Sequence, residues 1–194
     1  MARVENASLK KWREELFAGV KGDVLEIGAG TGASIDFYPS GDIRLIMAEP
    51  DEGMRNRLKQ RLARSGRATF SVASGSAENI DAADESFDFV ISSLVCCSVM
   101  DVGKALQEIK RVLKPGGRFI FIEHVAAEKG SAKRKWQERF NPLWVKVARN
   151  CHLNRETEQA ISAAGFRIEE IKNDTMRSSN PLVRPAIRGV AVKC

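Results

Sequence analysis

The stretch VLEIGAGTG, residues 24–32, decides the fold of this chain. Its first residues are a short apolar run, as in a strand buried on both faces, and three glycines follow at alternating positions. Glycine is used where the backbone must turn sharply or pass close to another group. The stretch therefore predicts a buried strand that ends in a tight turn able to approach a ligand.

Apolar strands and amphipathic helices alternate along the rest of the chain. The spacing predicts strands at 24–27, 43–48, 68–73, 87–92, 118–123, 166–171 and 187–192, helices at 6–20, 51–64 and 101–113, a further helix ending at 164, and a loop at 173–186. This alternation is typical of a mostly parallel sheet with helices on both faces, in which ligands bind beyond the carboxyl ends of the strands. We expect one α/β domain over residues 1–194.

Length, composition and cysteine spacing exclude several classes of protein. The chain has 194 residues, of which 43% are hydrophobic, and it contains no apolar run near the roughly 20 residues that span a bilayer. Its charged N-terminal stretch is unlike a secretory signal. Cysteines at 96, 97, 151 and 194 have no metal-binding spacing. We expect a reduced, cytoplasmic protein without a metal or disulfides.

The net charge of +6 is unevenly distributed. Residues 128–150 carry seven basic side chains against two acidic ones. A solvated helix face accounts for this excess, and a surface for an anionic membrane or an acidic ligand is the alternative. We expect a monomer, and we hold peripheral membrane contact as an open expectation.

The glycine turn satisfies two ligand patterns. Gly28, Gly30 and Ala33 fit the loose dinucleotide motif, which is weak by itself. Glu26 precedes the turn, and a carboxylate favours a ligand with an ammonium group over a pyrophosphate. Glu49 ends the second strand about 20 residues after the first glycine, where a carboxylate accepts hydrogen bonds from a ribose. A nucleoside that also carries an ammonium group fits both acids.

Five motifs together resemble the class I S-adenosylmethionine-dependent methyltransferases. They are VLEIGAGTG, LIMAEPD, GSAENI, DESFDFVISSLVCCSV and ALQEIKRVLKPGGRFIFIEH, in this order, over residues 20–125. The pattern is similar to that of the ubiquinone and menaquinone methyltransferase-like superfamily. The resemblance implies a Rossmann-like fold with a central, mostly parallel seven-stranded sheet and an antiparallel last strand. It also implies S-adenosyl-L-methionine as the cofactor and S-adenosyl-L-homocysteine as the product.

The likeness continues beyond this common core. Residues 123–157, together with the stretches DFYPSG and LVCCSV, resemble the methyltransferase-like thiol S-methyltransferases of animals. It does not extend to the N-terminus, where those proteins carry a membrane-associated segment. The resemblance implies that the methyl group moves by direct in-line displacement to a small-molecule thiol or to sulfide.

The resemblance implies cofactor contacts in four segments, each at the end of a predicted strand. These residues are Glu26, Gly28, Ala29, Gly30, Thr31, Gly32, Glu49, Pro50, Met54, Ser76, Ala77, Glu78, Leu94, Val95 and Ser98. Glu26 would hold the ammonium group directly or through water, and Glu49 would hold the ribose hydroxyls. Thr31 would either bind the cofactor's carboxylate or cap the following helix.

The adenine contacts are less clearly defined by the motifs. Pro50 and Met54 would give apolar contact to adenine, although core packing explains Met54 equally well. Ser76 stands where related enzymes often have an aspartate that accepts from the adenine amino group. Its hydroxyl accepts more weakly, so the backbone at Ala77 and the side chain of Glu78 are alternatives.

The expected acceptor side holds a catalytic candidate, His124, at the end of the fifth strand, although a structural role fits it as well. A strong base is not obligatory, because a thiol with a pKa of about 8.5 is partly ionised at neutral pH. Cys97 and His152 are expected to line the pocket, and direct transfer needs no enzyme nucleophile. Trp136 and Phe140 recur at a spacing of four, which fits core packing, an acceptor lid or a membrane face.

Residues 1–20, as an N-terminal helix, and residues 131–164, as a helical region, are expected to cover the acceptor. The main alternative function is a C- or O-methyltransferase of a lipophilic quinone or phenol, which needs a base more than a thiol does. A nucleic-acid partner is not expected, because SSLVCC occupies the place where amino-directed enzymes of that kind carry an Asn/Asp-Pro-Pro-aromatic motif. A cofactor-binding regulator without catalysis is a further alternative.

Overall fold

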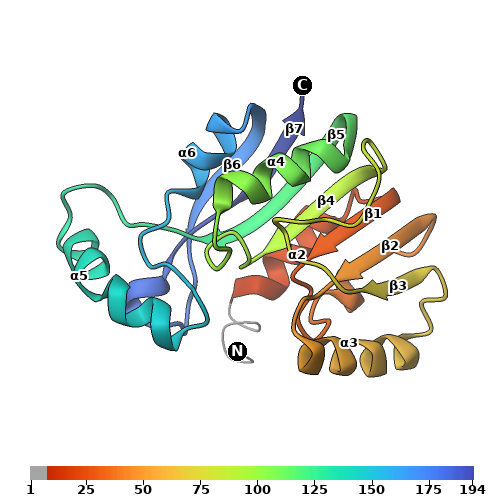
Figure 1. Ribbon diagram of the computed structural model, residues 1–194, viewed down its shortest axis with the longest axis horizontal. Coiled ribbons are helices and arrows are strands. Elements are labelled where there is room, and N and C mark those ends of the chain that lie inside the picture. The colour runs from red at the N-terminus through yellow and green to blue at the C-terminus, as the bar shows by residue number, and fades with distance from the viewer. Residues whose placement is uncertain (1–7) are drawn as a thin grey trace.

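The fold is one seven-stranded sheet with helices on both faces (Figure 1). The computed structural model describes residues 8–194, so the parts of the predicted helix and cover that fall on residues 1–7 lie outside it. The strands are β1 (Gly22–Ile27), β2 (Ile43–Ala48), β3 (Phe70–Ala73), β4 (Phe87–Ser93), β5 (Leu113–His124), β6 (Phe166–Thr175) and β7 (Pro185–Lys193). The helices are α2 (Lys10–Phe17), α3 (Glu52–Ser65), α4 (Val102–Val112), α5 (Ala132–Val147) and α6 (Thr157–Ala163), with short 3₁₀ turns η2 (Ile35–Phe37) and η3 (Pro181–Val183).

The strand order is β3-β2-β1-β4-β5-β7-β6. Strands β1 to β5 pair in parallel, and β7 lies antiparallel between β5 and β6. This confirms the predicted Rossmann-like sheet with an antiparallel last strand. The predicted loop at 173–186 is too long, because β6 and β7 remain paired as far as Thr175 and Pro185. A proline is tolerated there because it is the first residue of its strand.

Two apolar layers cover the sheet. Helices α4 and α6 pack on one face around Phe119 and Phe121. Helices α2 and α3 pack on the other face, where Phe17 and Leu58 contact the buried side chains of the first strands. Burial of both faces explains why the parallel strands read as continuous apolar runs in the sequence.

Polar caps set where the helices begin at the carboxyl edge of the sheet. Asp51 accepts from the backbone N–H of Met54 at the start of α3, and Asp101 accepts from that of Lys104 at the start of α4. Each cap satisfies an N–H group that has no partner inside its helix. Capped helices therefore follow β2 and β4 at the carboxyl edge of the sheet, the edge at which ligands bind in open α/β sheets.

Helix α5 stands to one side of the sheet (Figure 1). It is attached through the fully buried amide of Gln137, which accepts from the N–H of Ala127 at 2.7 Å and donates to the carbonyl oxygen of Leu182 at 2.8 Å. Among residues 8–194, no helix has both the length and the apolar character needed to cross a membrane.

Strands β6 and β7 approach each other so closely at Gly189 that a Cβ atom there would overlap the carbonyl oxygen of Glu170. Because that neighbour is backbone, the strands would have to separate. We expect Gly189→Ala to lower the free energy of unfolding by about 1–3 kcal/mol, measured by urea denaturation.

Gly19→Ala is the matched control, because a Cβ there meets no described atom within 4 Å. Its free energy of unfolding should stay within about 0.5 kcal/mol of wild type. Equal effects of the two substitutions would contradict the close approach of the strands.

Candidate functional site

The glycine turn lies at the carboxyl end of β1, beside β4. Gly28 and Gly30 both have a φ of +58°, in the left-handed region that glycine adopts readily. A Cβ on Gly28 would lie 2.5 Å from Cγ2 of Val95, so the turns after β1 and β4 are in close contact. A Cβ on Gly30 would meet no described atom within 4 Å. The backbone at Gly30 therefore borders space that a ligand can use.

A buried carboxylate joins this turn to the end of β2. Glu49 accepts from the N–H of Gly30 at 2.8 Å through Oε2 and from the N–H of Asp51 at 2.9 Å through Oε1. Each carboxylate oxygen has a second acceptor site. Two such oxygens beside the open backbone of Gly30 suit the paired hydroxyls of a ribose.

A second buried carboxylate stands near the end of β1. Oε2 of Glu26 accepts from Oγ of Ser34 at 2.7 Å and from the hydroxyl of Tyr38 at 3.0 Å. Burial raises the pKa of Glu26 above its ordinary value, and the two hydroxyl donors oppose that rise only in part. The charge of Arg13 also lowers this pKa, and a further cationic group, such as the ammonium group of an amino acid, would favour the ionised form in the same way.

The rest of the glycine turn is tightly packed except at Thr31. Ala29 is buried, and a Cβ on Gly32 would meet Ile35 and Leu58 at 2.7 Å. Thr31 is exposed, and the short η2 turn that follows begins after Ser34 rather than after Thr31. The alternative in which Thr31 caps a helix is therefore wrong.

The predicted adenine contacts occupy the ends of β2 and β3. Pro50 is exposed and Met54 is half-buried in the first turn of α3. Ser76 is half-buried and Ala77 is buried. The carboxylate of Glu78 accepts from the N–H of Met100 at 2.7 Å, so it fixes the chain after β4 to the chain after β3.

Glu123 organises the turn after β4, although sequence reasoning did not single it out. Its fully buried carboxylate accepts from the hydroxyl of Ser92 at 2.5 Å and from the N–H groups of Val95 at 3.1 Å and Cys97 at 3.3 Å. Burial raises the pKa of Glu123. The signal was present in the sequence as an acid at the end of the apolar run FIFIE.

The same turn is positioned by backbone bonds. Leu94 adopts a φ of +63°, which is strained for a leucine, and its N–H donates to the carbonyl oxygen of Ile122 at 2.8 Å. The N–H of Ser98 donates to the carbonyl oxygen of Val95 at 2.8 Å. Leu94, Val95 and Ser98 therefore form one compact turn beside Gly28.

On the other side of this turn, two thiols and an imidazole meet. His124 is buried at the end of β5, and its Nε2 lies 2.9 Å from Sγ of Cys151. Hydrogen bonds with Cys97 and then with His124 lower the pKa of Cys151 to about 4, while the bond to Cys151 raises the pKa of Cys97. No local pattern in the sequence predicted a role for Cys151, because its partners come from distant segments of the chain.

The chain after α5 crosses the carboxyl edge of the sheet. Arg149 and Asn150 have φ values of +50° and +63°, and the Asn150 amide donates to the carbonyl oxygen of Ser98 at 2.8 Å. Nη1 of Arg149 lies 3.5 Å from a carboxylate oxygen of Asp51. This segment therefore connects the turn after β2 with the turn after β4.

The predicted acceptor residues divide into two groups. His152 is half-buried, its N–H donates to the carbonyl oxygen of Cys97 at 2.8 Å, and burial lowers its side-chain pKa. Trp136 and Phe140 stack with ring centroids 5.4 Å apart on α5, but they are 51% and 42% exposed. The core-packing alternative for these two rings is therefore wrong.

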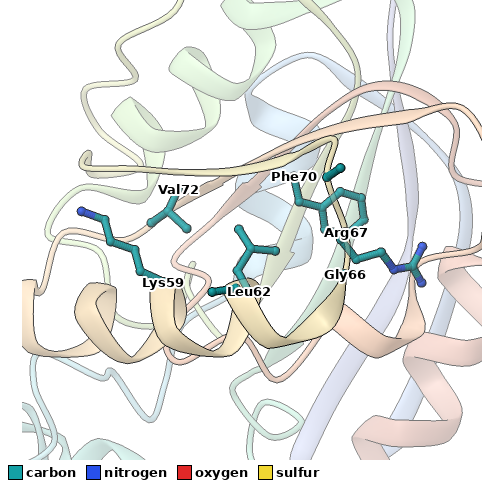
Figure 2. Close-up of a pocket in the computed structure, with 8 residues that line it drawn as sticks. Lys59, Leu62, Gly66, Arg67, Phe70 and Val72 are labelled. Atoms are coloured by element: carbon teal, nitrogen blue, oxygen red, sulfur yellow. The ribbon is translucent and has the colours of Figure 1, made fainter.

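A groove of about 490 Å³ lies elsewhere, between α3 and β3 (Figure 2). Figure 2 shows Leu62, Phe70 and Val72 lining it, with Lys59 and Arg67 at its ends. None of the predicted site residues lines this groove. The groove therefore gives no support to the predicted site residues, which lie at the carboxyl edge of the sheet.

Comparisons with known proteins show the family of this chain. The sequence profile of the methyltransferase domain matches residues 25–121. The thiol S-methyltransferase TMT1A of Homo sapiens is 39% identical over 183 residues, which span 91% of this chain and 74% of that protein. A demethylmenaquinone methyltransferase of Thermobifida fusca is 31% identical over 140 residues, spanning 69% of this chain and 59% of that protein.

A solved structure shares the fold of this chain. A crystal structure from Thermotoga maritima, titled as a SAM-dependent methyltransferase and possible histamine N-methyltransferase, superposes with a TM-score of 0.68. It is 25% identical, and the match covers 99% of this chain and 92% of that one.

The buried Glu26 makes stability depend on pH. Its raised pKa means that the native state binds this proton more tightly than the unfolded chain does, so its contribution is fully present below pH 4.5, the ordinary value, and is lost as pH rises through the folded pKa. Relative to Glu26→Gln, the free energy of unfolding of the wild type should fall in urea titrations as pH rises above the ordinary value of 4.5 and through the raised folded pKa.

Asp23→Asn supplies a control of opposite sign. The hydrogen bond from Arg44 lowers the pKa of Asp23 below its ordinary 3.8, so that contribution is present above this value and is lost as pH falls. Compared with Asp23→Asn, the wild type should gain stability as pH rises. A pH-independent difference between wild type and Glu26→Gln would contradict the effect of burial.

Proposed function

This chain belongs to the methyltransferase-domain family of S-adenosylmethionine-dependent enzymes, and on that premise we propose that it methylates the sulfur of a small-molecule thiol. S-adenosylmethionine supplies a methyl group on a sulfonium, which is an excellent leaving group. The protein must hold the two reactants in line and keep water away from them. The residues at the carboxyl edge of the sheet suit both tasks.

The cofactor side has a donor or acceptor for each part of the cofactor. Glu49 would accept from the ribose hydroxyls, next to the open backbone at Gly30. Glu26 would face the ammonium group of the methionine moiety. The turn from Leu94 to Ser98, which contacts Gly28 through Val95, would lie beside the methionine end.

The acceptor side would lie next to that turn, around Cys97, His124 and His152. His124 would orient the acceptor sulfur rather than act as an obligatory base, because a thiol is partly ionised at neutral pH. The segment at Arg149 and Asn150 would cover the site and exclude water.

The observation that carries the thiol proposal is the 39% identity with the human thiol S-methyltransferase over 91% of this chain. Because the match spans 91% of this chain, it includes most of the residues proposed for the acceptor side. The quinone or phenol alternative has weaker support, since the demethylmenaquinone methyltransferase match is 31% identical and spans 69% of this chain. A cytoplasmic location and the absence of disulfides stay predictions. A monomer and a single domain stay predictions.

We expect a methylation assay with labelled S-adenosylmethionine to yield product with an alkyl thiol and with sulfide, but not with a phenol or a quinol. A phenol has a pKa of about 10, so a phenol or quinol needs a base at the acceptor more than a thiol does. Product with phenol or quinol alone would overturn the thiol proposal while leaving the cofactor site intact.

The substitution Glu49→Gln tests whether the cofactor binds at the site described above. The amide can still accept one of the two backbone bonds, but it loses an acceptor for the ribose hydroxyls. We expect cofactor affinity, measured by calorimetry, to fall by about tenfold or more. Unchanged affinity would mean that the ribose binds elsewhere.

We also propose that α5 rests on an anionic membrane surface. Trp136, Phe140, Leu143 and Val147 recur at spacings of four, three and four, and their side chains are 42–70% exposed. We name this set the α5 stripe. Exposed Lys133, Lys135, Arg139 and Lys146 lie on the same helix. An apolar stripe beside basic side chains is typical of helices that lie in a membrane interface.

Sedimentation with vesicles that contain anionic lipid tests this proposal. The double substitution Trp136→Ser/Phe140→Ser should weaken binding by at least about tenfold, because two aromatic side chains no longer leave water. Met100→Ser is the control, since Met100 is 80% exposed but lies outside α5. Equal binding by the double variant and the control would favour the acceptor-lid alternative for these rings.

A further inference from the structure

Three side chains of the kinds that bind soft metals come together at the turn after β4. Sγ of Cys97, a ring nitrogen of His124 and Sγ of Cys151 all lie within 4.8 Å of one another. They come from the turn after β4, the end of β5 and the segment after α5. The hydrogen bond from the N–H of His152 to the carbonyl oxygen of Cys97 holds the third segment against the first.

The spacing of these atoms suits a tetrahedral metal. Zinc binds thiolate sulfur at about 2.3 Å and imidazole nitrogen at about 2.0–2.1 Å, so neighbouring ligand atoms in a tetrahedral site are about 3.5–3.8 Å apart. In the structure, Nε2 of His124 and Sγ of Cys151 are 2.9 Å apart and share a hydrogen bond. A metal would replace the shared proton and separate the two atoms by less than about 1 Å.

The surroundings suit the charge of such a site. Cys97 and His124 are buried, and Cys151 is half-buried. Two thiolates balance the charge of a divalent ion, so the filled site would be neutral, and a neutral group is cheaper to bury than a charged one. Two cysteines and one histidine also form a ligand set that leaves the fourth tetrahedral position open in catalytic zinc sites.

We propose that Cys97, His124 and Cys151 bind a zinc ion whose fourth position takes the acceptor thiol. The claim that the fourth position takes the acceptor thiol rests on the proposed function. Cys97 is two residues from Val95, which contacts the glycine turn at Gly28. The open coordination position of the zinc would therefore lie close to the bound cofactor. The spacing of the cysteines in the sequence predicts no metal site, because the three ligands come together only through the fold.

This site would explain how a thiol is recognised without a dedicated base. On binding, the thiol forms a bond from a sulfur lone pair to zinc and releases its proton to solvent. A thiol bound to zinc is deprotonated at neutral pH. Thiolates are also preferred by zinc over oxygen ligands such as phenols, so the ion would select for sulfur.

Metal content tests the first half of the proposal. The full chain, purified under reducing conditions, is incubated with zinc, desalted and analysed by inductively coupled plasma mass spectrometry. We expect about one zinc per chain, and at least about tenfold less in Cys97→Ser and Cys151→Ser. Cys194→Ser is the control, because Cys194 is an exposed free cysteine outside the cluster, and it should keep its zinc. Circular dichroism checks that each variant is folded.

Cobalt substitution tests the same site without any variant. Cobalt bound to thiolates gives a charge-transfer absorption band, and we expect this band in the wild-type protein. Adding an alkyl thiol without S-adenosylmethionine should change the band, because the thiol takes the open position. A cobalt band that the thiol leaves unchanged would overturn the acceptor half of the proposal.

Three outcomes would overturn the site itself. They are no zinc above the level of a protein without the cluster, equal zinc in Cys97→Ser and Cys194→Ser, and a disulfide between Cys97 and Cys151 in reduced preparations by mass spectrometry. Failure of the thiol methyltransferase proposal looks different. In that case zinc and cobalt bind as expected, while no methylated thiol forms.

Discussion

The carboxylate of Glu123 holds the turn after β4, and both sides of the site depend on that turn. It accepts from Ser92 and from the N–H groups of Val95 and Cys97 deep in the core. A buried donor left without a partner costs about 1–3 kcal/mol, so these bonds make the turn rigid. They also help to hold Leu94 in its strained conformation.

From this turn the site extends in two directions. Val95 contacts the glycine turn at Gly28, which in the proposed function faces the cofactor. Cys97 lies two residues further on, with its Sγ within 4.8 Å of His124 and Cys151, which in the proposed function face the acceptor. A single buried acid therefore positions residues on both sides of the proposed site, and a shift of this turn would move both sets.

The cofactor side and the acceptor side are built differently. The cofactor side consists of strand ends, where β1, β2 and β4 place Gly30, Glu49 and Val95 next to one another in a rigid sheet. The acceptor side is completed by the segment after α5, which is joined to the sheet by hydrogen bonds and by the exposed ion pair of Arg149 with Asp51. Exposed ion pairs contribute little, so this segment can open more easily than the sheet can deform.

Most of the fold could be predicted from the sequence, and the residues proposed for the cofactor side were visible in it as local motifs. Apolar runs, helix periods and turn residues are local signals, and the predicted order of strands and helices agrees with the structure. The acids Glu26 and Glu49 were recognisable because each stands beside an apolar strand. The acceptor side was less predictable, because Cys151 and Asn150 gain their partners only when α5 folds back over the sheet.

The sequence alone determined a parallel α/β sheet, a glycine turn after its first strand and the acids that suit a nucleoside with an ammonium group. These features depend on residues close together in the chain, where backbone geometry and strand burial leave few choices. Only the tertiary structure decided that Glu123 anchors the turn after β4, that Trp136 and Phe140 are exposed, and that two thiols meet His124. Those facts depend on contacts between distant segments, and no local pattern encodes which side chains will meet.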